Sequence, residues 1–112
     1  MTIFERIAAG EIPANIVRND DDVLAFHDIN PQAPVHVLII PQRAIPRIGA
    51  ARDSDGPLLG KLLLAAREIA VELGLDKSGY RLVMNNGPDA GESVPHLHIH
   101  LLGGRPMDWP PG

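Results

Sequence analysis

A chain of 112 residues is long enough for one domain, and we expect residues 1–112 to form a single one. With 45% hydrophobic residues and a formal charge of -4, the composition is typical of a globular protein and excludes a broad basic surface for nucleic acids. The absence of cysteine excludes disulfides and thiolate–zinc sites. We expect a cytoplasmic protein, because the chain has neither a secretory signal pattern nor an apolar run that could span a membrane.

The first half of the chain is predicted to form a short helix followed by strands. Thr2 can cap the helix, which cannot continue through Pro13. Residues 19–22, Asn-Asp-Asp-Asp, are typical of a turn between two strands. Residues 23–29 (VLAFHDI) alternate between two faces, and residues 35–41 (VHVLIIP) follow a proline-rich loop as a further strand.

The second half is predicted to contain the long helix of the protein. Leucine, isoleucine and alanine recur at three- and four-residue spacing over residues 54–73, which indicates an amphipathic helix capped by Asp53 or Ser54 and closed by Gly74. A strand, a glycine-rich loop and a last strand over residues 94–102 (VPHLHIHLL) follow. Several strands with one long helix predict an α+β domain built on an antiparallel sheet.

Three of the five histidines, His96, His98 and His100, stand at alternate positions. On a strand they share one face, while the aliphatic residues between them face the core. Alternate residues lie roughly 6.7 Å apart along a strand, whereas zinc–imidazole bonds are about 2.1 Å long, so three histidines on one straight strand cannot easily share one ion. A metal-dependent hydrolase would need His36 or a distant carboxylate as a further ligand.

Phosphate chemistry is the alternative that the pattern favours. The central imidazole, His98, can attack phosphorus if one ring nitrogen is free and the other keeps its proton, while its neighbours donate hydrogen bonds to phosphoryl oxygens. Such a site needs no Mg²⁺. Gly87, Gly91 and Ser93 precede the strand and allow backbone N–H groups to approach an anion, and Asn85 can add an amide. Without the histidines, this loop would be read as an ordinary connection.

Asp28 is the other unusual residue, because it ends an apolar stripe formed by Leu24 and Phe26. Its carboxylate can accept hydrogen bonds from two ribose hydroxyls. The competing interpretation is a turn that Asp28 forms with Asn30 and the proline after it. We expect His36 to be half-buried and bonded to its neighbours, with the option of supporting the site.

Residues 96–102, His-Leu-His-Ile-His-Leu-Leu, match the histidine triad pattern. Together with LAFHDINPQAPVHVLIIP, NNGPDAGESVPHLHIHLLGGR and the ending MDWPPG, they resemble the Hint branch of the histidine triad (HIT) family over nearly the whole chain. The resemblance implies a HIT-like fold, with a five-stranded antiparallel sheet, one long helix and one or two short ones, in a homodimer whose sheets join. It also implies metal-free and cofactor-free hydrolysis of purine nucleoside 5'-phosphoramidates, such as adenosine monophosphoramidate and adenylylated amines.

The resemblance assigns catalytic roles by position. His98 would form a nucleotidyl-histidine intermediate, which water then hydrolyses, and His100 would bind the α-phosphate. The backbone carbonyl of His96 would hold the protonated nitrogen of His98, and His36 and His96 would complete the histidine network. Ser93 would lie near the departing amine.

The resemblance also assigns binding roles. Asn85, Gly91 and Ser93 would contact phosphate or the leaving group, and Asp28 would bind the ribose hydroxyls. Trp109 would lie near the partner subunit's site and shape substrate choice. The purine pocket would be walled by seven apolar residues: Ile3, Phe4, Ile7, Ile12, Phe26, Ile29 and Leu38.

Two residues depart from the family pattern. Glu92 stands where many relatives have glutamine, and we expect its charge beside the phosphate loop to weaken binding of anionic leaving groups. Pro95 removes an N–H directly before the first histidine and restricts the entry to the strand. Two further functions are compatible with the same fold: a dinucleoside polyphosphate hydrolase, which Ser93 and the C-terminal tail disfavour, and a nucleotide-binding adapter that acts through its partners.

Overall fold

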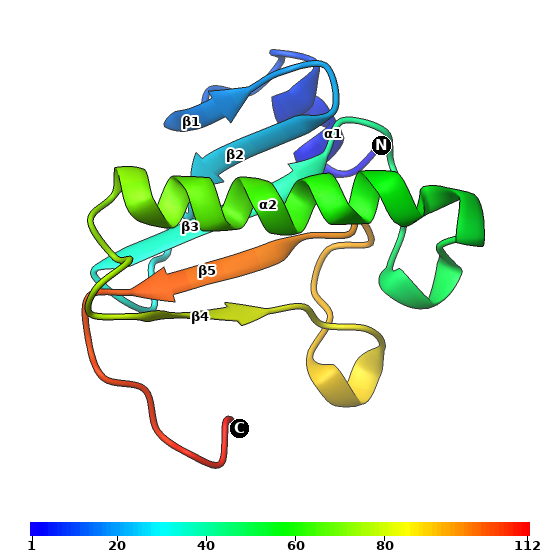
Figure 1. The fold of residues 1–112 in the computed structure, drawn as a ribbon. Helices are drawn as coiled ribbons and strands as arrows, with labels where there is room; N and C mark the ends of the chain where they lie inside the picture. The colour runs from blue at the N-terminus through cyan, green and yellow to red at the C-terminus, as the bar shows by residue number, and fades with distance from the viewer.

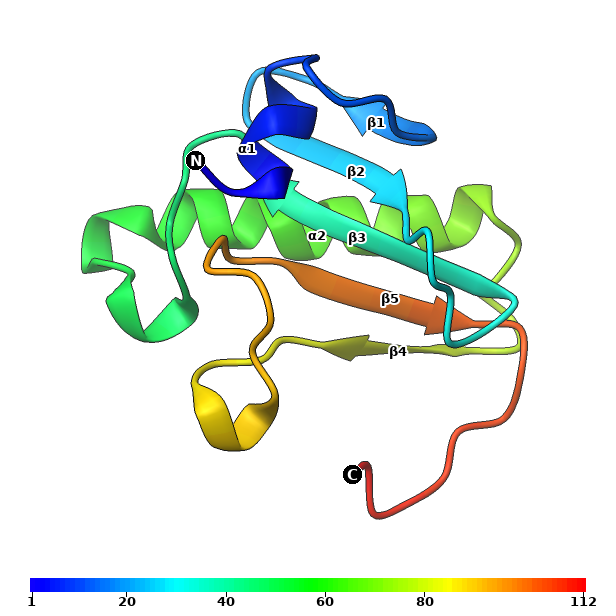
Figure 2. The same ribbon diagram turned by 180° about the vertical axis from the view of Figure 1, so that it is seen from behind.

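The computed structural model describes residues 1–112 and contains a five-stranded antiparallel sheet with the strand order β1-β2-β3-β5-β4. The long helix α2 covers one face of this sheet, and the short helix α1 lies against the other face (Figure 1; Figure 2). The predicted α+β fold class is therefore confirmed. The elements are α1 (Ile3–Ala8), β1 (Ile16–Asn19), β2 (Val23–His27), β3 (Val35–Pro41), α2 (Gly56–Glu72), β4 (Tyr80–Val83) and β5 (Ile99–Gly103).

The larger core lies between α2 and the sheet. Leu97, Ile99 and Leu101, which alternate with the three histidines, all point into it and are almost fully buried. The prediction that the aliphatic face of this segment supplies the core is thus confirmed. On α2, Leu62 is fully buried, whereas Leu63 was also expected on the buried face and is 54% exposed. Successive residues of a helix are about 100° apart around its axis, so Leu63 turns away when Leu62 faces the sheet.

A smaller core lies under α1, on the histidine face of the sheet. Phe4 of α1 packs edge-on against Phe26, with 5.5 Å between the ring centroids, and Leu24, Leu38 and Ile40 complete the cluster. Helix α1 begins at the predicted cap. Thr2 Oγ1 accepts the N–H of Glu5 at 3.1 Å, and the Glu5 carboxylate accepts the N–H of Thr2 at 3.0 Å.

The start of α2 differs from the prediction. Residues 53–55 form a 3₁₀ turn, so neither Asp53 nor Ser54 caps the helix. Asp55 occupies the N-cap position, but its carboxylate accepts the N–H of Arg52 and pairs with Arg43 instead. At the other end, Gly74 follows the helix with a φ of +75°, in agreement with the prediction.

The last strand is shorter than predicted. Hydrogen-bonded pairing of β5 begins at Ile99, so His96, which lies in a bend, and His98 precede the strand and only His100 lies within it. Pro95 has no N–H to contribute to a sheet, and the N–H of Leu97 donates instead to the carbonyl of Ile45 at 2.6 Å. Neither helix of the structure combines the length and hydrophobicity that crossing a membrane would require.

Candidate active site

A cavity of about 230 Å³ lies on the histidine face of the sheet, beside α1. Asp28, Ser93, His98 and His100 line it together with a set of apolar side chains. Ile29 is 94% exposed and therefore stands at the rim. The structure thus brings together residues from both halves of the sequence, including all seven that were assigned to a purine pocket: Ile3, Phe4, Ile7, Ile12, Phe26, Ile29 and Leu38.

Several predicted site residues lie outside the lining of this cavity. His36 and His96 are buried behind it, and Asn85 and Gly91 are not among the lining residues. Gly91 has a φ of +77°, a conformation that favours glycine, so the turn of the loop at this position explains the residue. Trp109 is 83% exposed on the C-terminal tail and does not line the cavity of its own chain.

His98 has a defined tautomer. Its Nδ1 lies 2.6 Å from the backbone carbonyl oxygen of His96. A carbonyl oxygen only accepts hydrogen bonds, so Nδ1 donates and the lone pair of the neutral ring is on Nε2. Phe4 packs edge-on against this ring, with 5.0 Å between the centroids, and leaves His98 only 5% exposed.

His100 and His36 form a second pair behind His98. The ring centroids of His98 and His100 are 4.9 Å apart, and His36 Nε2 lies 2.9 Å from His100 Nδ1. Burial lowers the pKa of His100 to about 4, with a smaller contribution from positive charge on its histidine neighbours. Burial also lowers the pKa of His36, against the opposing effect of Asp28. His100 is therefore neutral at pH 7, and burial disfavours the charged form of His36 as well.

His96 is fully buried and does not line the cavity. Its Nε2 lies 2.9 Å from the carbonyl oxygen of Pro41, so Nε2 donates and Nδ1 is left without a hydrogen-bond partner. Burial lowers the pKa of His96. The side chain of His96 is thus a buried neutral ring, while its backbone carbonyl orients His98.

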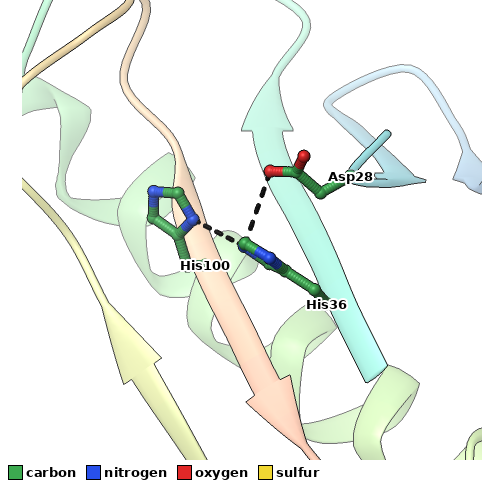
Figure 3. Close-up of side chains that lie close together, drawn as sticks. All are labelled: Asp28, His36 and His100. Atoms are coloured by element: carbon green, nitrogen blue, oxygen red, sulfur yellow. Dashed lines mark hydrogen bonds and ion pairs between the residues drawn. The ribbon is translucent and has the colours of Figure 1, made fainter. Parts of the chain in front are cut away.

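Asp28 forms the turn that was one of the two arrangements expected from the sequence. Its Oδ1 accepts the N–H of Asn30 at 2.8 Å, which is the predicted turn and the reason why β2 ends at His27. Its Oδ2 lies 3.5 Å from His36 Nε2 (Figure 3). The carboxylate also lines the cavity, with 20% of the side chain exposed. One oxygen of Asp28 is therefore used structurally and the other faces the histidines.

Asp28, His36 and His100 converge closely enough to be considered as metal ligands, and Figure 3 shows His36 between the other two. The N–H of Gln32 donates to His36 Nδ1 at 3.1 Å, so neutral His36 carries its proton on Nε2. Nε2 is the atom that a shared ion would need, and a metal-bound histidine normally donates from its other nitrogen. The donor set therefore does not fit a metal ion.

Glu92 does not present the free charge that was expected beside the phosphate loop. Arg47 donates to both of its carboxylate oxygens, at 2.8 and 3.0 Å, and the N–H of Gly87 donates to Oε1 at 3.1 Å. These bonds, led by that from Arg47, lower the pKa of Glu92 to about 2. The charge is neutralised, and the pair ties the glycine-rich loop to the segment after β3. Nothing in the sequence signals this contact, because 45 positions separate the partners.

We expect the Arg47–Glu92 pair to make stability depend on acid pH. The folded-state pKa of Glu92 is depressed from 4.5 to about 2, so its stabilising effect is complete above 4.5 and is lost as the pH falls through that interval. Glu92→Gln should therefore lower Tm at pH 7, and the difference from the parent protein should narrow toward pH 2. Thermal melts from pH 2 to 8 measure this. A difference independent of pH would contradict the assignment.

Comparison with known proteins identifies the family. Residues 9–107 match the model of the HIT domain. The chain is 57% identical over 111 residues to an uncharacterized HIT-like protein of Synechocystis, covering 99% of this chain and 96% of that protein. It is 54% identical, with the same coverage, to a protein of the same description from Synechococcus elongatus. The chain therefore belongs to the HIT family.

Solved structures agree with the fold. A HIT family hydrolase from Legionella pneumophila superposes with a TM-score of 0.98 at 50% identity, and all of both chains is covered. A histidine triad nucleotide-binding protein from Candida albicans superposes with a TM-score of 0.82 at 31% identity, over 96% of this chain and 85% of that one. The sheet and the long helix are thus those of HIT proteins.

Proposed function

We propose that this chain is a nucleotide hydrolase of the Hint branch, which cleaves the P–N bond of purine nucleoside 5'-phosphoramidates through a covalent intermediate on His98. The observation that carries the proposal is the tautomer of His98, whose Nδ1 donates to the His96 carbonyl and leaves the Nε2 lone pair on a residue that lines the cavity. The apolar wall of the cavity suits a purine base, and its polar residues suit a ribose and a phosphate.

In the first step, Nε2 of His98 attacks the α-phosphorus, a P–N bond to histidine forms, and the bond to the amine breaks. The His98 ring becomes a cation during this step. The His96 carbonyl, which accepts a hydrogen bond from Nδ1–H, stabilises that charge. The departing nitrogen must gain a proton, which we assign to the hydroxyl of Ser93 in the same cavity. His100, next to His98, donates a hydrogen bond to a phosphoryl oxygen.

In the second step, water attacks the same phosphorus and displaces His98. The products are the nucleoside monophosphate and the free amine. The proton lost by water returns to Oγ of Ser93, which gave its proton to the amine, and the site regains its starting state. Relatives support this class of reaction: the Legionella protein is described as a hydrolase and the Candida protein as nucleotide-binding. No step requires a metal ion, in agreement with the unsuitable donor set of Asp28, His36 and His100.

Mass spectrometry of the intact protein tests the proposal. The protein is mixed with adenosine 5'-phosphoramidate in the presence of a chelator and quenched without acid, because phosphohistidine-type bonds are acid-labile. We expect a transient mass increase of one adenylyl group, mapped to His98. Rapid turnover without any adduct on His98, or turnover that requires added zinc, would contradict the mechanism.

Asp28→Ala is expected to raise KM for nucleoside phosphoramidates about tenfold or more, because a charged acceptor of the ribose hydroxyls is lost. Steady-state kinetics measure the effect with two matched substrates. One is a nucleoside phosphoramidate, which carries the ribose, and the other has an alkyl chain in place of the nucleoside. The alkyl phosphoramidate is the control and should lose little. Equal losses for both substrates would show that Asp28 acts through His36 rather than through the ribose.

We also propose that the protein is a homodimer joined through the outer edge of β4. This edge strand has unpaired backbone groups, and Tyr80 and Leu82 on it are partly exposed. An apolar cavity of about 400 Å³ lies beside it, between β4 and α2, and Leu63 contributes to its lining. In such a dimer Trp109 of one chain would lie near the partner's site.

Sedimentation equilibrium tests the dimer. The parent protein should sediment as a dimer, and Leu82→Arg should shift it to monomer, because the substitution places a charge in the apolar contact. Arg18→Ala, on the strand at the opposite edge, is the control and should remain dimeric. A dimer that survives Leu82→Arg would place the interface elsewhere.

A further inference from the structure

The histidines of the site are connected to the protein surface by a series of hydrogen bonds that meet at the backbone of one residue. It runs from Arg105, after β5, through the backbone of Gln32 to His36 and then to His100. We propose that the backbone N–H of Gln32, held in place by Arg105, is a positioning group that sets the tautomers of His36 and His100 so that His100 presents an N–H to the phosphate. The inference rests on the proposed function and extends it to two residues outside the cavity.

The direction of the first two bonds is fixed by chemistry. A backbone N–H can only donate, so His36 Nδ1 accepts from Gln32 at 3.1 Å and carries no proton. The proton of neutral His36 is then on Nε2, which lies 2.9 Å from His100 Nδ1. His36 therefore donates and His100 accepts. The proton of neutral His100 is consequently on its Nε2, the nitrogen that does not face His36.

Because burial keeps His36 and His100 neutral, the hydrogen bonds determine their tautomers rather than their charges. His36 is 5% exposed, and neither ring gains a proton readily in this environment. If His36 held its proton on Nδ1 instead, its Nε2 would accept and His100 would have to donate from Nδ1. His100 Nε2 would then turn a lone pair toward a negatively charged phosphoryl oxygen, which would be repelled.

Arg105 holds the Gln32 peptide in the position that this chain requires. Its Nε and one terminal nitrogen both donate to the Gln32 carbonyl oxygen, at 3.2 and 2.9 Å. The preceding residue, Gly104, packs so closely that an added Cβ would lie 2.8 Å from Pro34. The exposed loop between β2 and β3 is thus fastened at Gln32, the residue whose N–H donates to His36.

The direct test replaces the Pro31–Gln32 amide by an ester, which removes the N–H and leaves the side chain in place. We expect kcat for adenosine phosphoramidate to fall roughly 10- to 100-fold, the scale for losing one donor to a developing charge, with a smaller change in KM. Gln32→Ala keeps the N–H and is the matched control, with kcat within about twofold of the parent protein. Gln32→Pro removes the same N–H in a ribosomally made chain.

Nitrogen-15 spectra of the imidazole rings give a readout that is independent of turnover. In the parent protein, His36 and His100 should both show an unprotonated Nδ1 and a protonated Nε2. The ester should convert both rings to the opposite tautomer. Unchanged tautomers and unchanged kcat in the ester would overturn the inference.

Two further outcomes separate the parts of the proposal. Arg105→Ala should shift the same ring signals partially and lower kcat less than the ester does, while Arg67→Ala, which removes an exposed arginine of α2, should change neither. Arg105→Ala spectra and rates identical to the parent's would remove Arg105 from the chain. If the parent protein shows these tautomers but no phosphoramidate hydrolysis, the proposed function fails and the hydrogen-bond chain stands.

Discussion

Replacing His98 by alanine is expected to abolish phosphoramidate hydrolysis, with kcat lowered on the order of 10⁴- to 10⁶-fold, as when other hydrolases lose a covalent nucleophile. The reason is that His98 alone combines a position in the cavity with an Nδ1–H bonded to a carbonyl and a free Nε2 lone pair. Neither neighbour can substitute for it, because His96 is fully buried and His100 Nδ1 is paired with His36. Single-turnover kinetics measure the loss.

Two controls accompany His98→Ala. Circular dichroism and Tm establish that the variant folds, since His98 is buried. Calorimetry of AMP binding should give a Kd within about tenfold of the parent value, because the purine wall and Asp28 are untouched. A variant that hydrolyses the substrate at the parent rate would refute the nucleophile. A variant that binds AMP, has no activity and still complements a deletion strain would favour the adapter function.

Leu101→Ala is expected to lower the free energy of unfolding by about 2–5 kcal/mol. Leu101 is 0% exposed, and it packs against α2 directly behind the histidine row. A domain of this size has a total stability of roughly 5–15 kcal/mol, so the loss is a large fraction of it. Urea unfolding followed by circular dichroism measures the change.

Leu64→Ala is the matched control for this prediction. Leu64 lies on α2 and is 49% exposed, so its truncation should cost less than about 1 kcal/mol. If Leu101→Ala lowered the free energy of unfolding no more than Leu64→Ala does, the core would have to relax around the missing side chain. Leu101 is adjacent to His100. We therefore expect the variant to lose activity over the same temperature range in which it unfolds.

The secondary structure was predictable where a local pattern controls it. The spacing of leucine and alanine identified α2, and Thr2 formed the expected cap of α1. The boundaries were less predictable, because tertiary contacts decide them. The Asp28–Asn30 turn ends β2, and the bond from Leu97 to Ile45 delays the start of β5.

The members of the candidate site were predictable to the extent that they belong to one recognisable motif. The spacing of His96, His98 and His100 indicates phosphate or metal chemistry. The apolar residues that line the cavity were predicted from the resemblance to the HIT family. Neither the spacing nor the resemblance predicts which residues form hydrogen bonds with the site from outside the motif. Gln32, Arg105 and Arg47 carry no sequence signal, since each acts through a contact with a residue far along the chain or through its backbone.

The sequence by itself determined an α+β domain with one long helix, a histidine row with one aliphatic face, and the family to which the chain belongs. The first two follow from periodicity and composition, which depend on neighbouring residues, and the family follows from the resemblance of its motifs. Only the tertiary structure decided that His36 reaches His100, that Glu92 is neutralised by Arg47, and which ring nitrogen carries each proton. Hydrogen bonds act over about 3 Å, so these features depend on how distant segments are brought together in the sheet and its loops.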